Sequence, residues 1–289
     1  MVFTILVVIL FLLVIGKNGF HLFESKFLFY PIKSYQQLPA LTRQDVKLPG
    51  GATGWWFHDF PGQPTILYCH GNAANISYWN HMINLIHSQR LNLFIFDYHG
   101  FGQSHGKPSV KSMIQDGMEA YQFLVQHVQP SQMVVWGESL GGVPAIQIAC
   151  HHPIAYLALA GTFSHPADVI KEWNLNPWLE YPARLIPKLD NVKYLARVKV
   201  PVVIIHSPED EVIPYSCALE LYQAIQSPCR KLVTISGSHT NPQMTTEQLR
   251  EIFGFCCLNT EYCQAAEPHL QKICHDCRQF CPFNFGGKP

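Results

Sequence analysis

Three residues that lie far apart in the sequence have the types and the order needed for nucleophilic catalysis. Ser139 stands in a Gly-Glu-Ser-Leu-Gly run at 137–141, directly after an apolar stretch at 133–136. A strand that turns sharply into a helix at such a serine lifts the hydroxyl clear of the sheet, and the flanking glycines let two backbones pass close together. Asp210 and His239 follow downstream, which is the order of acid and histidine that this nucleophile elbow requires.

The acid and the base each follow an apolar stretch that reads as a strand. A serine hydroxyl is a poor nucleophile at neutral pH, so it needs a base within hydrogen-bond reach that an acid orients. His239 follows the stretch 231–235 through a glycine turn, which favours it as the base. Three adjacent acidic residues follow the stretch 200–206. Asp210 is the favoured acid of the three, with Glu209 and Glu211 beside it, and a solvated acidic turn is the alternative interpretation.

Acyl transfer also needs two backbone N–H donors aimed at the developing oxyanion. We expect one donor at Leu140, which follows the nucleophile at a helix N-terminus where the helix dipole helps. The other is expected in the loop after the apolar stretch 65–69, where Gly71 lets the backbone turn under the site. Asn72 is the first choice and Ala73 the second. A plain strand-to-helix turn is the alternative for this loop.

Short apolar strands alternate with helical patterns along the chain. This alternation predicts a buried, mainly parallel sheet that helices cover on both faces. Reactive groups then lie on loops at the carboxyl ends of the strands. A hairpin signal joins the first two strands. The expected strands lie at 45–48, 53–58, 65–69, 93–96, 133–136, 154–160, 200–206 and 231–235, and the expected helices at 77–89, 110–128, 140–149, 215–225 and 245–253.

Size and composition indicate one large domain with appendages at both ends. The chain has 289 residues, of which 48% are hydrophobic and 14% charged, so it can bury a full-sized core. Lys and Arg together number 20, as do Asp and Glu, and no basic stripe is present. Nucleic acid is therefore not expected as a partner.

The N-terminus carries an apolar segment that we interpret as a membrane anchor, assigned to residues 1–23. As a helix, residues 2–15 would reach roughly 20–25 Å, so they would span a bilayer core of about 30 Å only if the helix continued towards Phe23. No basic region precedes the segment and no small-residue cleavage site follows it, although a cleaved signal peptide and a buried helix remain alternatives. Lys17, Lys26, Lys33 and Arg43 follow the segment and mildly favour the cytoplasmic side for the body of the protein.

Five motifs in register resemble the α/β-hydrolase fold family, and within it the membrane-anchored serine hydrolases that include protein depalmitoylases. The resemblance covers about residues 45–253. One residue departs from this branch, because His99 stands where the branch usually has Arg. The motifs are His-Gly-Asn-Ala-Ala-Asn at 70–75, Asp-Tyr-His-Gly-Phe-Gly-Gln-Ser at 97–104, Gly-Glu-Ser-Leu-Gly-Gly at 137–142, the stretch 206–214, and Gly-Ser-His at 237–239.

Carried over residue by residue, the resemblance implies the same site as the residues themselves. It makes Ser139 the nucleophile, Asp210 the acid and His239 the base, with Asn72 and Leu140 as the oxyanion donors. It also implies a small cap at about residues 163–198, between the sixth and seventh strands of the fold. The aromatic residues of this cap either line the entrance for an acyl chain or pack the cap onto the body.

We therefore expect an anchor at 1–23, a connector at 24–44, an α/β-hydrolase domain at 45–253 and a Cys-rich tail at 254–289. The connector is expected to hold an interfacial or edge segment at 27–31. Six of the ten cysteines fall in the tail, where the sequence leaves disulfides, a metal and neither as open alternatives. The other four, at 69, 150, 217 and 229, are interpreted as ordinary packed or surface thiols.

The expected function is hydrolysis of ester or thioester bonds through an acyl-enzyme on Ser139. No cofactor and no catalytic metal is needed for this chemistry. The substrate is an acyl ester or thioester carried by a lipid or an acylated protein at a membrane. A peptidase on the same fold is the rival within enzymes, and a non-catalytic membrane scaffold is the rival outside them.

Overall fold

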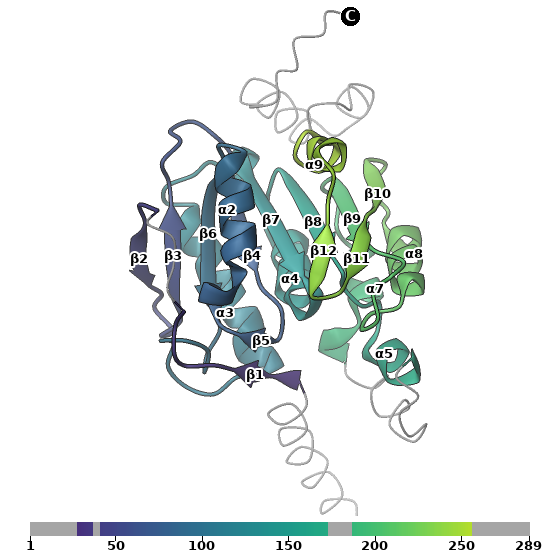
Figure 1. Cartoon of the computed structure of the whole chain (residues 1–289), viewed down its shortest axis with the longest axis horizontal. Helices are drawn as coiled ribbons and strands as arrows, with labels where there is room; N and C mark the ends of the chain where they lie inside the picture. The colour runs from purple at the N-terminus through teal and green to yellow at the C-terminus, as the bar shows by residue number, and fades with distance from the viewer. Residues whose placement is uncertain (1–27, 37–40, 173–186, 256–289) are drawn as a thin grey trace, which may run out of the picture.

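An eight-stranded sheet forms the centre of the part of the chain that the structure describes (Figure 1). The structure is a computed structural model, and it describes residues 28–36, 41–172 and 187–255. From edge to edge the strand order is β10-β9-β8-β7-β4-β6-β3-β2. The strands are β2 (Gln44–Lys47), β3 (Thr53–Phe57), β4 (Thr65–Cys69), β6 (Asn92–Asp97), β7 (Met133–Glu138), β8 (Tyr156–Ala160), β9 (Val202–His206) and β10 (Arg230–Thr234).

The directions of the strands confirm the predicted mainly parallel sheet. β3 pairs antiparallel with β2 and β6, whereas every other neighbouring pair in this sheet is parallel. All residues of β4, β6 and β9 are buried, as expected for strands that are covered on both faces. Two small sheets stand beside this one: β1 (Tyr30–Pro31) pairs with β5 (Ala73–Ala74), and β11 (Ser236–Ser238) pairs with β12 (Asn241–Gln243).

Helices on the two faces of the sheet bury two separate apolar clusters. Alternate residues of β4 illustrate the division, since Leu67 belongs to one cluster and Tyr68 to the other. Figure 1 shows α2 in front of the sheet. The first cluster is completed by α3 (Val110–Leu124), α4 (Gly142–His151), α7 (Asn191–Leu195) and α8 (Tyr215–Ala224), and the second by α2 (Asn80–Ser88) and α9 (Thr246–Phe253).

The remaining helices are short. They are α5 (Pro166–Glu172) and the 3₁₀ turns η2 (Ile76–Trp79), η3 (Pro130–Gln132), η4 (Ser139–Gly141) and η6 (Pro187–Leu189).

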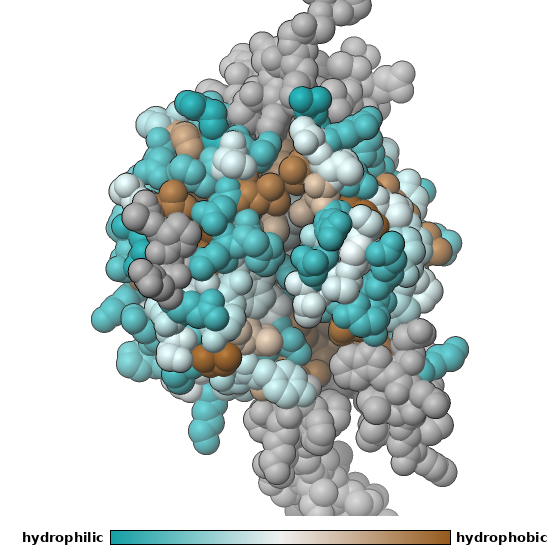
Figure 2. Space-filling view, in the orientation of Figure 1, coloured by the Kyte–Doolittle hydropathy of each residue, from teal (hydrophilic) through white to brown (hydrophobic). Residues whose placement is uncertain are grey.

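The face of the molecule in Figure 2 is mostly hydrophilic, and its hydrophobic residues appear in small separate groups. Apolar side chains are thus concentrated in the two clusters rather than on this face.

Several of the predicted helices differ in their ends from the structure, and the helix expected at 77–89 begins with the 3₁₀ turn η2 before α2 starts at Asn80. The helix expected at 140–149 begins with the 3₁₀ turn η4 before α4 starts at Gly142. The helix expected to reach residue 128 ends at Leu124, because the following residues tighten into three-residue turns such as His127 N–H to the Leu124 carbonyl. The starts of α3 and α9 carry capping boxes at Ser109 and Thr245, each of which contributes about 1 kcal/mol.

Several expectations fall wholly or partly outside the described residues. The predicted anchor at 1–23 and nearly all of the Cys-rich tail lie outside them, and both stay predictions, as do the domain boundaries. Among the residues that are described, no helix has the length and apolar character to cross a membrane. Of the cap at 163–198, the described part holds α5, η6 and α7. The four cysteines outside the tail match the prediction of ordinary thiols, since three are buried and Cys150 is half-buried.

Candidate active site

Ser139 stands at the end of β7 in a strained backbone conformation. Its φ angle is +52°, in the left-handed region that non-glycine residues rarely adopt. Such strain persists only where the surrounding structure fixes it. Thr162, which follows β8, supplies one restraint because its hydroxyl donates a hydrogen bond to the Ser139 carbonyl. The strand, sharp turn and helix predicted from the sequence are therefore all present.

The glycines around Ser139 are required by close packing of the backbone. A Cβ atom on Gly137 would lie 2.7 Å from both the Gly141 carbonyl oxygen and the Cβ atom of Ala145. A Cβ atom on Gly141 would overlap the carbonyl oxygen of Cys69 at the end of β4, and one on Gly142 would overlap the Thr162 side chain. The turn can therefore pass between β4 and β8 only without side chains at these positions.

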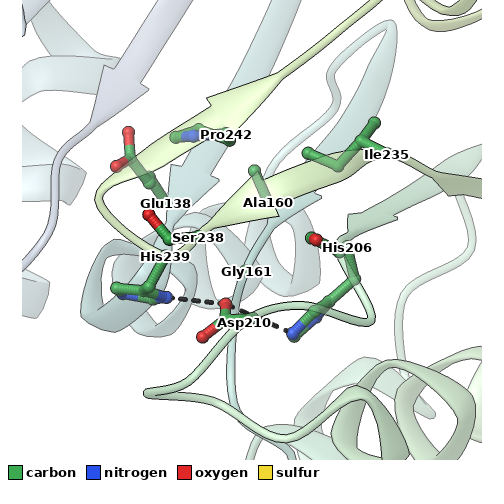
Figure 3. A pocket seen from close by; sticks show the side chains of 10 residues that line it. Glu138, Ala160, Gly161, His206, Asp210, Ile235, Ser238, His239 and Pro242 are labelled. Carbon is green, nitrogen blue, oxygen red and sulfur yellow. Dashed lines mark hydrogen bonds and ion pairs between the residues drawn. The ribbon is translucent and has the colours of Figure 1, made fainter.

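The structure brings the three predicted residues of the triad into one hydrogen-bonded chain. His239 Nε2 lies 3.1 Å from Ser139 Oγ, and His239 Nδ1 lies 2.7 Å from Asp210 Oδ2. Figure 3 shows the His239 and Asp210 side chains facing each other. Because an ionised carboxylate only accepts, Nδ1 carries a proton and donates it to Asp210, which leaves Nε2 of the neutral ring to accept from the serine hydroxyl.

The site holds Asp210 ionised and favours a protonated His239. Burial alone would raise the pKa of Asp210, but hydrogen bonds from His206, His239 and the Ile213 backbone hold this pKa well below its usual range. Burial lowers the pKa of His239, but the hydrogen bond and charge of Asp210, together with the charges of Glu138 and Glu211, outweigh it and raise the pKa. Negative charges around the ring stabilise the imidazolium that forms when the histidine base takes up the serine proton.

His206 is a second buried histidine at the acid, which the sequence analysis did not single out. Its Nε2 lies 3.4 Å from Asp210 Oδ2 and 3.0 Å from the Ile213 carbonyl, so this nitrogen carries the proton. Figure 3 shows Asp210 between His206 and His239. The Asp210 Oδ1 atom accepts from the backbone N–H groups of Val212 and Ile213. Both carboxylate oxygens are thus oriented by donors.

Beside the triad lies a cavity of about 30 Å³ (Figure 3). A cavity of this size accommodates a water molecule but not an acyl chain. The cavity is lined by Asp210 and His239 but not by Ser139, so it lies next to the acid and the base rather than next to the nucleophile. Its lining residues are Glu138, Ala160, Gly161, His206, Ser207, Asp210, Ile235, Ser238, His239 and Pro242.

The two predicted oxyanion donors lie on the two loops that flank Ser139. Leu140 is in the first turn of η4, where backbone N–H groups have no partner within the helix. On the other side, Gly71 is so close that a Cβ atom on it would lie 3.5 Å from the Ser139 Cβ atom. Asn72 follows directly, whereas Ala73 is already part of β5. This arrangement favours Asn72 over Ala73 as the second donor.

His70 fixes the peptide that carries the Asn72 N–H group. Its Nδ1 lies 2.8 Å from the Gly71 carbonyl oxygen, so Nδ1 carries the proton and donates it. Burial lowers the pKa of His70 to about 3, which keeps the ring neutral. The Gly71 carbonyl and the Asn72 N–H belong to one planar peptide unit, and a hydrogen bond on the first therefore orients the second.

The segment at 28–36 contacts this loop through backbone hydrogen bonds, of which the sequence analysis predicted only an interfacial or edge segment at 27–31. Tyr30 N–H donates to the Asn72 carbonyl over 2.8 Å, and Ile32 N–H donates to the Ala74 carbonyl over 2.9 Å. The Tyr35 hydroxyl lies 2.5 Å from the Oδ2 atom of Asp97, the last residue of β6. The predicted connector is therefore a structural part of the site.

His99, the departure from Arg, anchors its loop to α3. Its Nδ1 lies 2.5 Å from Asp116 Oδ1, and its backbone N–H donates to Asp116 Oδ2 over 2.8 Å. Burial raises the pKa of Asp116 to about 6, although the contacts with His99 act against this rise. His99 thus anchors the loop at 97–104 through both its main chain and its side chain.

Comparison with known proteins gives the chain a family. A family model described as the alpha/beta hydrolase fold matches residues 64–185. An uncharacterised protein of Mycobacterium tuberculosis is 30% identical over 195 residues, which are 66% of this chain and 69% of that protein. Human alpha/beta hydrolase domain-containing protein 17B is 28% identical over 194 residues, which are 66% of this chain and 65% of that protein.

Solved structures show the same fold at lower sequence identity. An esterase of Pyrococcus furiosus superposes with a TM-score of 0.61 and 16% identity, over 88% of this chain and 98% of that one. An acylaminoacyl peptidase of Pyrococcus horikoshii superposes with a TM-score of 0.54 and 15% identity, over 70% of this chain and 38% of that one. Together with the sheet order, the elbow and the position of the histidine loop, these matches establish that the chain belongs to the α/β-hydrolase fold family.

Proposed function

We propose that this protein is a serine hydrolase that cleaves ester or thioester bonds of acyl groups through an acyl-enzyme on Ser139. The observation that carries the proposal is the continuous chain from Ser139 Oγ through His239 to Asp210, with distances of 3.1 and 2.7 Å. A serine, an imidazole and an ionised carboxylate in this order are the parts that activate a hydroxyl for acyl transfer.

The reaction follows from the positions of these groups. His239 Nε2 takes the proton from Ser139 Oγ as the oxygen attacks the acyl carbonyl, and the negative charge that develops on the carbonyl oxygen falls between the N–H groups of Leu140 and Asn72. The imidazolium then gives its proton to the leaving alcohol or thiol as the bond to the acyl carbon breaks. In the second half, His239 deprotonates a water molecule that attacks the acyl-enzyme, and the proton returns to Ser139 as the acid is released. No cofactor takes part.

The substrate and the membrane association are part of the same proposal. The resemblance to membrane-anchored serine hydrolases and the apolar segment at 1–23 support a substrate whose acyl group belongs to a lipid or an acylated protein. The basic residues that follow the apolar segment support the cytoplasmic face. A peptidase is the second candidate, because one of the structures with the same fold is an acylaminoacyl peptidase.

A substrate series distinguishes these candidates. The full chain is purified in detergent and assayed with p-nitrophenyl esters of increasing acyl length, with the matching acyl thioesters and with the matching p-nitroanilides. We expect turnover of the esters and thioesters but not of the anilides, because an amine is a poorer leaving group than an alcohol or a thiol.

The Ser139→Ala variant serves as the control, and its rate should fall to that of buffer alone. Faster turnover of the anilides than of the esters would favour the peptidase. If the wild-type protein turned over no member of the series, the result would favour a non-catalytic scaffold over a hydrolase.

A further inference from the structure

His239 lies on a small hairpin that needs support from outside. β11 and β12 have three residues each, all of which are exposed or half-buried, and Gly237 in the middle of β11 adopts a φ angle of +89°. An isolated two-stranded hairpin is marginally stable in water. The distance from the imidazole to Ser139 therefore depends on contacts that tie this hairpin to the rest of the fold.

Two of these ties come from the acidic residues on either side of Asp210. Glu209 Oε2 accepts a hydrogen bond from Gly237 N–H over 2.9 Å, and Glu211 Oε2 accepts one from His239 N–H over 3.1 Å. Asp210, between them, bonds the imidazole itself. All three acids thus contact the histidine loop, in place of the solvated acidic turn that was the alternative interpretation.

Glu211 differs from Glu209 in acting on the residue that carries the imidazole. Its bond fixes the main chain of His239, from which the side chain extends to Asp210 and Ser139. A carboxylate acceptor makes this hydrogen bond stronger than a neutral one. Its charge also adds to those of Asp210 and Glu138, which face the same ring, and all three favour the protonated form of His239. Glu209 instead bonds the main chain at Gly237, two residues before the one that carries the imidazole.

Glu138 is the third of these charges and is held in place separately. Its Oε2 accepts hydrogen bonds from Trp79 Nε1, over 2.9 Å, and from the Tyr68 hydroxyl. Glu138 precedes Ser139 at the end of β7, and these bonds hold it without any contribution from Glu211. Substitutions at Glu211 therefore leave the Glu138 carboxylate in place.

We propose that Glu211 is a positioning residue, which holds the backbone of His239 so that the imidazole spans Asp210 and Ser139, and which favours the imidazolium that forms during each half of the reaction. This proposal rests on the proposed function for its meaning in catalysis. Glu209 secures the same hairpin at Gly237, two residues away from the imidazole-bearing residue.

The test separates geometry from charge with two variants. Glu211→Gln keeps an oxygen that can accept from His239 N–H but removes the charge, whereas Glu211→Ala removes both. We expect the acid limb of the kcat/KM profile to move to lower pH by about 0.5 in both variants, because loss of a nearby negative charge lowers the pKa of His239. Glu211→Ala should in addition lower kcat about tenfold with little change in KM, because a displaced base slows chemistry rather than binding.

Glu209→Gln is the matched comparison and should move the acid limb less than Glu211→Gln, and Glu247→Gln on α9 controls for a general change of surface charge. The proposal would be overturned if both Glu211 variants kept the wild-type acid limb and kcat, or if Glu247→Gln shifted the limb equally.

NMR titration of the His239 imidazole, assigned with His239→Gln, gives a second reading that needs no turnover. If wild type proved inactive, the proposed function would fail, but a lowered pKa of His239 in Glu211→Gln would still support the contact, and an unchanged pKa would refute it.

Discussion

Replacement of His239 by Ala is expected to lower kcat/KM for ester hydrolysis by about 10⁴ to 10⁶. The imidazole is the group whose Nε2 lies 3.1 Å from Ser139 Oγ, and no other side chain in the described part of the chain bonds that oxygen. Without it the hydroxyl keeps its proton and the leaving group receives none. The backbone donors at Leu140 and Asn72 remain, so the residual rate stays above the uncatalysed one. Steady-state hydrolysis of a short p-nitrophenyl ester measures the loss.

An exposed histidine on α2 provides the control for this variant. His81→Ala removes an imidazole from the surface, and its kcat/KM should remain at the wild-type value. Thermal unfolding of the two variants shows whether either change affects the fold. A His239→Ala enzyme that is folded and keeps most of its activity would contradict the assignment of this residue as the base.

Replacement of Gly141 by Ala is expected to destabilise the fold by at least about 4 kcal/mol and to abolish activity together with it. The added Cβ atom would overlap the carbonyl oxygen of Cys69 and lie 2.5 Å from that of His70. Both are backbone atoms at the end of a central strand, so they cannot rotate away as a flexible side chain would. Chemical denaturation followed by circular dichroism measures the loss of stability.

Gly62→Ala is the matched comparison for the stability measurement. Gly62 has a φ angle of +78°, but a Cβ atom on it would meet no atom within 4 Å. Its substitution should therefore cost only the backbone strain, about 1 kcal/mol. Similar losses in the two variants would mean that the close approach at Gly141 does not control the turn.

The parts of the site that follow strands could be predicted because two patterns coincide. Apolar stretches of four to six residues mark buried parallel strands, and the carboxyl ends of such strands meet at one edge of the sheet. Ser139, Asp210 and His239 each follow one of these stretches, and the structure brings them into hydrogen-bonding distance of one another. The glycines around Ser139 also allowed the sharp turn between the strand and the helix to be predicted.

The parts that could not be predicted depend on contacts between distant segments without a local signal. Glu209 and Glu211 stood in the sequence as competing acids, and only their distance to the backbone of residues 237–239 shows a different role. Likewise, the pairing of β1 with β5 joins two strands of two residues each, which are too short for any periodicity to reveal. In the sequence His206 is only the last residue of an apolar stretch, and the structure is needed to show that its Nε2 lies beside Asp210.

The departure at His99 shows how a family pattern and a single chain can differ without a change in chemistry. The sequence shows a histidine at 99 in place of the usual arginine, but it does not show what that side chain contacts. In the structure the imidazole reaches Asp116, which is buried in α3. A contact of this kind depends on the distance in space between α3 and the loop. The number of residues between them in the sequence does not give that distance.

Labelling with a fluorophosphonate probe tests the central claim most directly, since the probe reacts covalently with an activated serine. Wild type and Ser139→Ala are incubated with the probe, and the modified peptide is located by mass spectrometry. The account predicts a single adduct on Ser139 in wild type and no labelling of Ser139→Ala. Absence of labelling in folded wild type, or equal labelling of the alanine variant, would contradict it.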